Sequence, residues 1–167
     1  SRARCLSGHP WVFAGELEKP PAAAASPGDA AVLTDGGGYF VGRGFLSPGP
    51  LTLRLLSRDP VEAQDAAFFA RRIAAAQALR ARDLPGEEAV RLVASEGDGL
   101  PGLVVDRYGS HAVLQATTAG MDRRLGEIAG ALKAEGGVVS VLGRNDLASR
   151  EREGLERGVS QLLGTTP

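Results

Sequence analysis

This sequence has few of the residues that many functional sites require. It contains one cysteine, Cys5, and two histidines, His9 and His111. A lone cysteine excludes an internal disulfide and a zinc site built from several cysteines, and it favours a reducing, cytoplasmic setting. No base lies near Cys5 in the sequence, so no nucleophilic role is expected for it. Both histidines are predicted to be structural, and no metal site is expected.

The chain also lacks an excess of positive charge. Its 19 Lys and Arg are balanced by 20 Asp and Glu, whereas a free-standing nucleic-acid-binding domain is usually basic. Any RNA-binding surface must therefore be local or belong to a larger one. Residues 1–58 are mildly positive, with six basic side chains against four acidic ones. No apolar run approaches the roughly 18 residues needed to span a bilayer, so no membrane partner is expected.

Aromatic side chains are sparse, at 5% of the residues. Trp11 and Phe13 can fill the core of a small β domain or stack on RNA bases, and the core interpretation is favoured. Arginine can pair bidentately with phosphate, and aromatic rings can stack on unpaired bases. The candidate RNA-binding residues on these grounds are His9, Trp11, Lys19, Arg43 and Arg54.

No catalytic or cofactor-binding constellation stands out. The glycine cluster at residues 35–38 does not open a helix, so it is predicted to be a hairpin turn and not a phosphate-binding loop. Paired carboxylates can act as acid and base, but the available ones are predicted to lie at turns and strand ends. These carboxylates are Glu96, Asp98, Asp106 and Asp146. No catalytic residue is assigned.

The apolar pattern divides the chain into three zones. In residues 1–58, apolar runs between turn residues predict strands at 30–34, 39–46 and 51–57, which would form a small β-barrel. In residues 59–87, Asp59-Pro60 is predicted to open a helix over residues 61–84. Its apolar stripe at helical spacing is Phe69, Ile73, Ala76 and Leu79.

Residues 88–163 are predicted to form a second α+β unit of β-β-β-α-β order. The strands are expected at 89–95, 103–107, 112–116 and 138–142, with a helix over residues 120–135. Gly126 and Gly130 inside that helix suggest close packing against a neighbour. The charge-rich residues 150–157 are predicted to be a solvated segment or a short helix. The fold class expected for the whole chain is α+β.

Several motifs resemble one known family. Residues 8–13, Gly-His-Pro-Trp-Val-Phe, are similar to the opening of RlmI-like methyltransferases. Residues 38–44, Gly-Tyr-Phe-Val-Gly-Arg-Gly, resemble a strand of that family's PUA domain. The most specific stretch is residues 96–109, Glu-Gly-Asp-Gly-Leu-Pro-Gly-Leu-Val-Val-Asp-Arg-Tyr-Gly, and residues 144–146 continue the match.

The resemblance implies a function in RNA methylation. Family members use S-adenosylmethionine to methylate cytosine C5 in large-subunit ribosomal RNA. They contain a PUA domain, a central α+β domain and a Rossmann-like methyltransferase domain with a cysteine that attacks cytosine C6. The expectation is that this chain carries the first two and lacks the Rossmann-like domain. The chain would then recognise RNA in the cytoplasm and would be inactive alone. It would hold no cofactor of its own, and S-adenosylmethionine would bind to the full-length parent protein.

Two alternatives remain open at the level of sequence. The chain can be a free-standing PUA-type RNA-binding module with no enzyme attached. It can also be a protein-interaction or dimerisation module, since its near-neutral charge suits a homodimer as well as an RNA partner.

Overall fold

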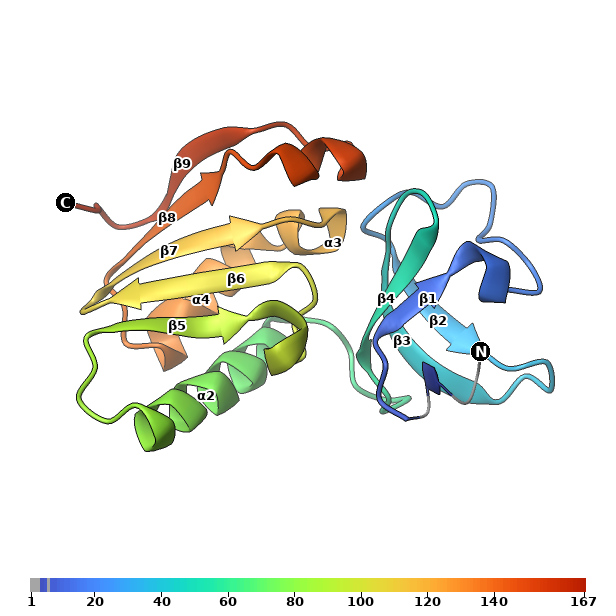
Figure 1. Cartoon of the computed structure of the whole chain (residues 1–167), viewed down its shortest axis with the longest axis horizontal. Helices are drawn as coiled ribbons and strands as arrows, with labels where there is room; N and C mark the ends of the chain where they lie inside the picture. Colours follow the sequence, from blue (N-terminus) through green and yellow to red (C-terminus); the bar gives the residue numbers. More distant parts are fainter. Residues whose placement is uncertain (1–3, 6) are drawn as a thin grey trace.

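The computed structural model describes residues 4–5 and 7–167, and it shows two lobes, each built on one β-sheet (Figure 1). The first sheet has the order β1-β4-β3-β2 and the second the order β5-β6-β7-β8-β9. No helix in the described part of the chain is long and apolar enough to cross a membrane.

The first sheet is antiparallel throughout. Its strands are β1 (Trp11–Phe13), β2 (Ala30–Thr34), β3 (Phe40–Leu46) and β4 (Leu51–Ser57), and the short 3-10 helix η1 (Ala14–Glu16) follows β1. β2 and β3 meet at the glycine turn, which is therefore a hairpin, as predicted. A small cluster of six buried residues fills this lobe: Cys5, Val12, Val41, Leu46, Leu53 and Leu55.

The connection between the lobes leads into the long helix α2 (Ala66–Asp83). The prediction that this helix opens at Asp59-Pro60 was wrong. Asp65 is the N-cap residue, because its carboxylate accepts a hydrogen bond from the Phe68 amide at 3.0 Å. Residues 61–65 are instead a non-helical connection that follows a turn at Asp59, where the Glu62 amide donates to the Asp59 carbonyl.

The second sheet is mixed. Its strands are β5 (Ala89–Ala94), β6 (Leu103–Tyr108), β7 (His111–Ala116), β8 (Ser140–Asn145) and β9 (Gly158–Leu163), with the 3-10 helix η2 (Ser95–Asp98) after β5. β7 and β8 are parallel, and the helices α3 (Ala119–Asp122) and α4 (Leu125–Glu135) connect them. The 3-10 helix η3 (Ala148–Glu153) precedes β9.

The predicted β-β-β-α-β order was wrong in two places. The chain adds β9, which pairs antiparallel with β8, and the predicted helix 120–135 is interrupted at Arg123 and Arg124. The parallel β7–β8 pair joined by helices is a βαβ crossover, so the lobe has α/β character that the α+β prediction missed. Gly126 and Gly130 do not serve close packing, because a Cβ atom at either would meet nothing within 4 Å.

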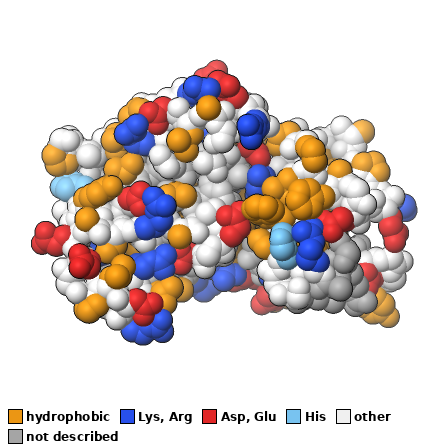
Figure 2. Space-filling view, in the orientation of Figure 1, with side chains coloured by type: hydrophobic (Ala, Val, Ile, Leu, Met, Phe, Trp, Pro, Cys, Tyr) orange, Lys and Arg blue, Asp and Glu red, His pale blue; other side chains and the backbone are white. Residues whose placement is uncertain are grey.

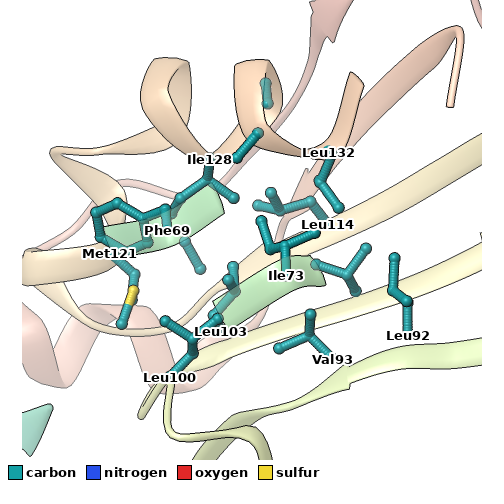
Figure 3. Close-up of a cluster of buried hydrophobic side chains, with 14 of the residues drawn as sticks. Phe69, Ile73, Leu92, Val93, Leu100, Leu103, Leu114, Met121, Ile128 and Leu132 are labelled. Carbon is teal, nitrogen blue, oxygen red and sulfur yellow. The ribbon is translucent and has the colours of Figure 1, made fainter. Parts of the chain in front are cut away.

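One large hydrophobic cluster lies between the second sheet and the helices α2 and α4. Ten of its side chains are labelled in Figure 3, among them Phe69 and Ile73 of α2, which face Ile128 and Leu132 of α4. The predicted helical stripe of α2 is thus on the buried side, with Phe69, Ile73 and Ala76 all buried. Phe45 and Leu56 of the first sheet also belong to this cluster, so the two lobes share part of one core.

Candidate nucleic-acid interface

Trp11 lies at the junction between the lobes. The residue is 37% exposed, and its indole Nε1 donates a hydrogen bond to Glu96 Oε1 at 2.8 Å. The His9 ring meets the indole edge-on, with ring centroids 5.8 Å apart. Strand alternation explains this placement, since Val12 points into the small cluster and Trp11 points out. The core interpretation of Trp11 was therefore wrong, and Phe13 is only half-buried.

Two basic side chains surround Trp11. Arg4 Nη2 donates to the Trp11 carbonyl at 3.0 Å, pairs with Glu16 and lies over the Phe13 ring at 5.3 Å. Arg54 is the cross-strand partner of Trp11 in the β1–β4 register. Figure 2 shows the result, a group of hydrophobic side chains on the first lobe that borders a histidine and both basic and acidic groups.

Arg54 joins the two lobes. Its guanidinium donates to the Ser47 hydroxyl and to Glu153 Oε1, the latter at 2.9 Å, and its side chain is mostly buried. Glu153 also accepts from the Ala119 amide at 3.3 Å. Both hydrogen bonds use Nη1, and the ion pair with Glu153 holds the guanidinium at the contact between the lobes.

Arg43 has a similar internal role. Its Nη1 donates to the carbonyls of Pro60 and Glu62, at 3.2 Å and 3.0 Å, and so fixes the connection between the lobes. Lys19, in contrast, is exposed and makes no hydrogen bond or ion pair with residues 4–5 and 7–167. It borders a cavity of about 760 Å³ beside β2. The structure thus brings together His9, Trp11 and Arg54 and leaves Arg43 and Lys19 apart.

The carboxylates considered for catalysis have structural partners. Asp98 binds Arg80 through both oxygens at 2.6 Å and 3.1 Å, and Asp106 pairs with Arg91 at 2.8 Å. Asp146 pairs with Arg144 at 2.9 Å. Within the described residues, no group of three histidines, cysteines and carboxylates could hold a metal ion.

Glu96 differs from these three carboxylates, because its hydrogen bonds come from Trp11 and Ser95 and not from an arginine. Burial alone would raise its pKa, but hydrogen bonds from the Ser95 hydroxyl and from Trp11 outweigh that effect and lower the pKa below 4.5. Glu96 is therefore ionised at neutral pH and faces the first lobe.

Arg150 is buried, although the sequence pattern did not predict its burial. The charge-rich stretch predicted a solvated segment, but Arg150 is 4% exposed. It donates to the Ala116 and Glu156 carbonyls and pairs with Asp122 at 2.8 Å. No periodicity marks it, because two of its partners, Ala116 and Asp122, lie 34 and 28 residues earlier in the chain.

The comparison with known families concerns the first lobe. A model of the PUA-like domain matches residues 2–58. The first lobe is thus similar to the PUA-like domain and is called by that name below. The matched residues contain β1 to β4 and all five candidate residues. Trp11, Arg43 and Arg54 lie on strands, whereas His9 lies before β1 and Lys19 lies before β2.

Two curated relatives match nearly the whole chain. Ribosomal RNA large subunit methyltransferase I from Cronobacter sakazakii and the protein of that name from Escherichia coli O9:H4 are each 36% identical over 165 residues. The match covers 97% of this chain, and the chain spans 41% of each relative's length. The resemblance predicted from the motifs is therefore confirmed.

Solved structures correct the predicted fold class. A candidate SAM-dependent methyltransferase from Streptococcus mutans superposes with a TM-score of 0.77 at 16% identity, covering 99% of this chain and 42% of that one. A candidate methyltransferase complexed with SAH gives the same score and covers 99% of this chain and 41% of its own. The prediction that the Rossmann-like methyltransferase fold is absent was therefore wrong. It rested on the layout of the family that the motifs resemble, in which the Rossmann-like domain follows the central α+β domain.

The expectation that no cofactor belongs to this chain is contradicted by the same fold match, since one of the matching structures contains SAH. Rossmann-type nucleotide sites use a carboxylate that accepts hydrogen bonds from the ribose and a glycine-rich turn that lets the backbone approach the ligand closely. Among the described residues, Asp98, Asp106 and Asp146 are already paired with arginines, and the 35–38 glycine turn belongs to a hairpin. These groups do not fit the cofactor, and no residue is assigned to it.

Proposed function

We propose that this chain recognises RNA for an S-adenosylmethionine-dependent methyltransferase that acts on cytosine C5 of large-subunit ribosomal RNA. The observation that carries the proposal is the 36% identity to ribosomal RNA large subunit methyltransferases over 97% of the chain, together with the PUA-like domain. The cofactor would supply the methyl group. A cytoplasmic location is part of the proposal, since ribosomal RNA is the substrate.

The RNA-binding surface in this proposal is centred on Trp11 and His9, with Arg4 beside them and Lys19 further along the PUA-like domain. Arg43 and Arg54 have internal roles in this proposal, because their guanidinium groups bind the connection between the lobes and Glu153, respectively. None of the findings favours the free-standing module or the homodimer over this function, and neither is part of the proposal.

The experiment is a titration of a fluorescently labelled large-subunit ribosomal RNA fragment with this chain, followed by anisotropy over a salt series. Phosphate contacts release counterions, so the affinity should fall linearly on a logarithmic plot against salt. Lys19→Gln should weaken binding and make the slope shallower by about 1. Glu87→Gln, on the exposed turn before β5, is the control and should leave the slope unchanged. Absence of binding at low salt would contradict the proposed function.

A further inference from the structure

The Trp11–Glu96 pair combines one side chain from each lobe. Trp11 is in β1 of the PUA-like domain and Glu96 is in η2 of the second lobe, 85 residues later, and the two are joined at 2.8 Å. Trp11 is the only tryptophan of the chain. The Nε1–H group on the indole edge donates to Glu96, the His9 ring packs against the indole in a T-shaped arrangement, and Trp11 is still 37% exposed. A ring held by such contacts with exposed surface is suited to stacking on another ring.

Glu96 is held firmly in place. Its Oε2 accepts from the Ser95 hydroxyl at 2.6 Å, while Oε1 accepts from Trp11. Ser95 has φ of 52°, the only positive φ at a residue other than glycine in the part of the chain that the structure describes. Such a backbone conformation persists only where the surroundings impose it. Ser95 Oγ in turn accepts from the Gly102 amide at 2.8 Å, which ties η2 to the start of β6.

The carboxylate retains unused acceptor capacity. An ionised carboxylate offers about four lone-pair directions. Those at Glu96 accept hydrogen bonds from Trp11, from Ser95 and from the Glu96 backbone amide, which leaves about one for a ligand. A negative charge beside an RNA surface repels phosphate, so it weakens contacts to the RNA backbone. The Glu96 carboxylate can, however, accept hydrogen bonds from the amino groups of bases, as carboxylates do from cytosine N4.

We propose that Trp11 and Glu96 form a site for one unpaired nucleobase, in which the indole stacks on the base and Glu96 accepts a hydrogen bond from its exocyclic amino group. This inference rests on the proposed function, because it names the part of the RNA that the surface binds. It predicts a preference for cytosine or adenine over uracil. Uracil has no amino group, and its single ring N–H lies between two carbonyl oxygens that oppose the carboxylate.

The test uses single-stranded oligomers of cytidine, adenosine and uridine of about ten nucleotides, a length within the ~4–16 nucleotides that single-strand sites cover. Anisotropy of the labelled RNA reports binding anywhere on the chain. Fluorescence of the single tryptophan reports binding at Trp11, because a stacked base quenches an indole. The cytidine and adenosine oligomers should quench Trp11 and bind about ten-fold more tightly than the uridine oligomer.

Three variants separate stacking from base selection. Trp11→Ala should lower the affinity for every oligomer about ten-fold, while Trp11→Phe keeps a ring and should retain most of it. Glu96→Gln should raise the affinity for the uridine oligomer and abolish the preference for cytidine and adenosine, because an amide both donates and accepts hydrogen bonds. Tyr39→Ala removes an aromatic that is 72% exposed on the β2–β3 turn and should change nothing. Circular dichroism verifies that each variant is folded.

The outcomes distinguish this inference from the proposed function. RNA that binds by anisotropy without quenching Trp11, or a Glu96→Gln variant that shifts all oligomers equally, would overturn the nucleobase site and leave RNA recognition standing. Binding to the ribosomal RNA fragment but to none of the oligomers would also overturn it. If the chain binds no RNA, including the ribosomal fragment, both the proposed function and this inference are refuted.

Discussion

The two lobes differ sharply in how they are stabilised. The second lobe buries a large cluster between its sheet and two helices, whereas the PUA-like domain has six buried residues of its own. Phe45 and Leu56 of the PUA-like domain are buried in the larger cluster, part of which is drawn in Figure 3. Small cores rarely stabilise a domain alone. The comparison teaches that the PUA-like domain depends on its neighbour, and that the two lobes form one folding unit.

Removing a side chain from the larger cluster should have the greatest effect. Phe69→Ala should lower the free energy of unfolding by about 3–5 kcal/mol, because it leaves a cavity between α2 and the sheet. Leu53→Ala in the small cluster should cost about 2–3 kcal/mol. Urea unfolding followed by Trp11 fluorescence reports the PUA-like domain, and far-ultraviolet circular dichroism reports the helices of the second lobe. Both signals should shift together in Phe69→Ala. Two separate transitions would refute the single folding unit.

Breaking the buried ion pair between the lobes should rank second. Glu153→Ala leaves the Arg54 guanidinium without its charged partner and the Ala119 amide without an acceptor. The expected loss is about 2–3 kcal/mol, somewhat less than for a fully buried pair because Arg54 keeps some exposure. Glu153→Gln keeps a hydrogen-bond acceptor for Arg54 and Ala119, so it should lower the free energy of unfolding by less than Glu153→Ala. Equal losses in the two variants would show that the charge contributes nothing.

A steric change at the junction should rank third. Gly120 of α3 lies against Phe45 of the PUA-like domain, and a Cβ atom there would come within 2.4 Å of the Phe45 ring. Gly120→Val should therefore push the lobes apart and cost about 2 kcal/mol. Gly126→Ala, in open space on α4, is the matched control and should instead stabilise the chain by up to ~1 kcal/mol. Thermal unfolding of the two variants decides this.

The smallest expected effect concerns pH. The Ser57 hydroxyl, followed by Arg71 and Arg72, holds the pKa of Glu62 below its ordinary value of 4.5, although burial opposes this. A carboxylate with a lowered pKa stabilises the folded state above that ordinary value, and this contribution is lost as the pH falls below 4.5. Glu62→Gln should therefore flatten the dependence of stability on pH below about 4.5, with Glu87→Gln as control. Parallel profiles for wild type and Glu62→Gln would contradict this.

Much of the secondary structure could be predicted from local patterns, and the tertiary relations could not. Alternation and turn residues located β2, β3 and β4, and the stripe of α2 identified its buried side. The sequence did not reveal β9, since residues 158–163 show no clear alternation, nor the break between α3 and α4. The candidate site shows the same division. Exposure of Trp11 follows from its strand register, but its partner Glu96 is 85 residues away.

The arginines show the physical limit most clearly. Arg43 and Arg54 matched what an RNA-binding surface requires, and their side chains bind carbonyls and a carboxylate of the same chain. A guanidinium suits a phosphate and an internal carboxylate equally well. Only the folded arrangement decides which partner it meets, so a lone arginine in the sequence cannot be assigned to either.

The central claim is that RNA is recognised by the two lobes as one unit, and RNA binding by junction variants tests it most directly. Anisotropy of a labelled large-subunit ribosomal RNA fragment would be measured at low salt with wild type, Gly120→Val and Gly126→Ala. The account predicts binding by wild type and Gly126→Ala with equal affinity, and clearly weaker binding by folded Gly120→Val. No binding by wild type, or undiminished binding by Gly120→Val, would contradict it.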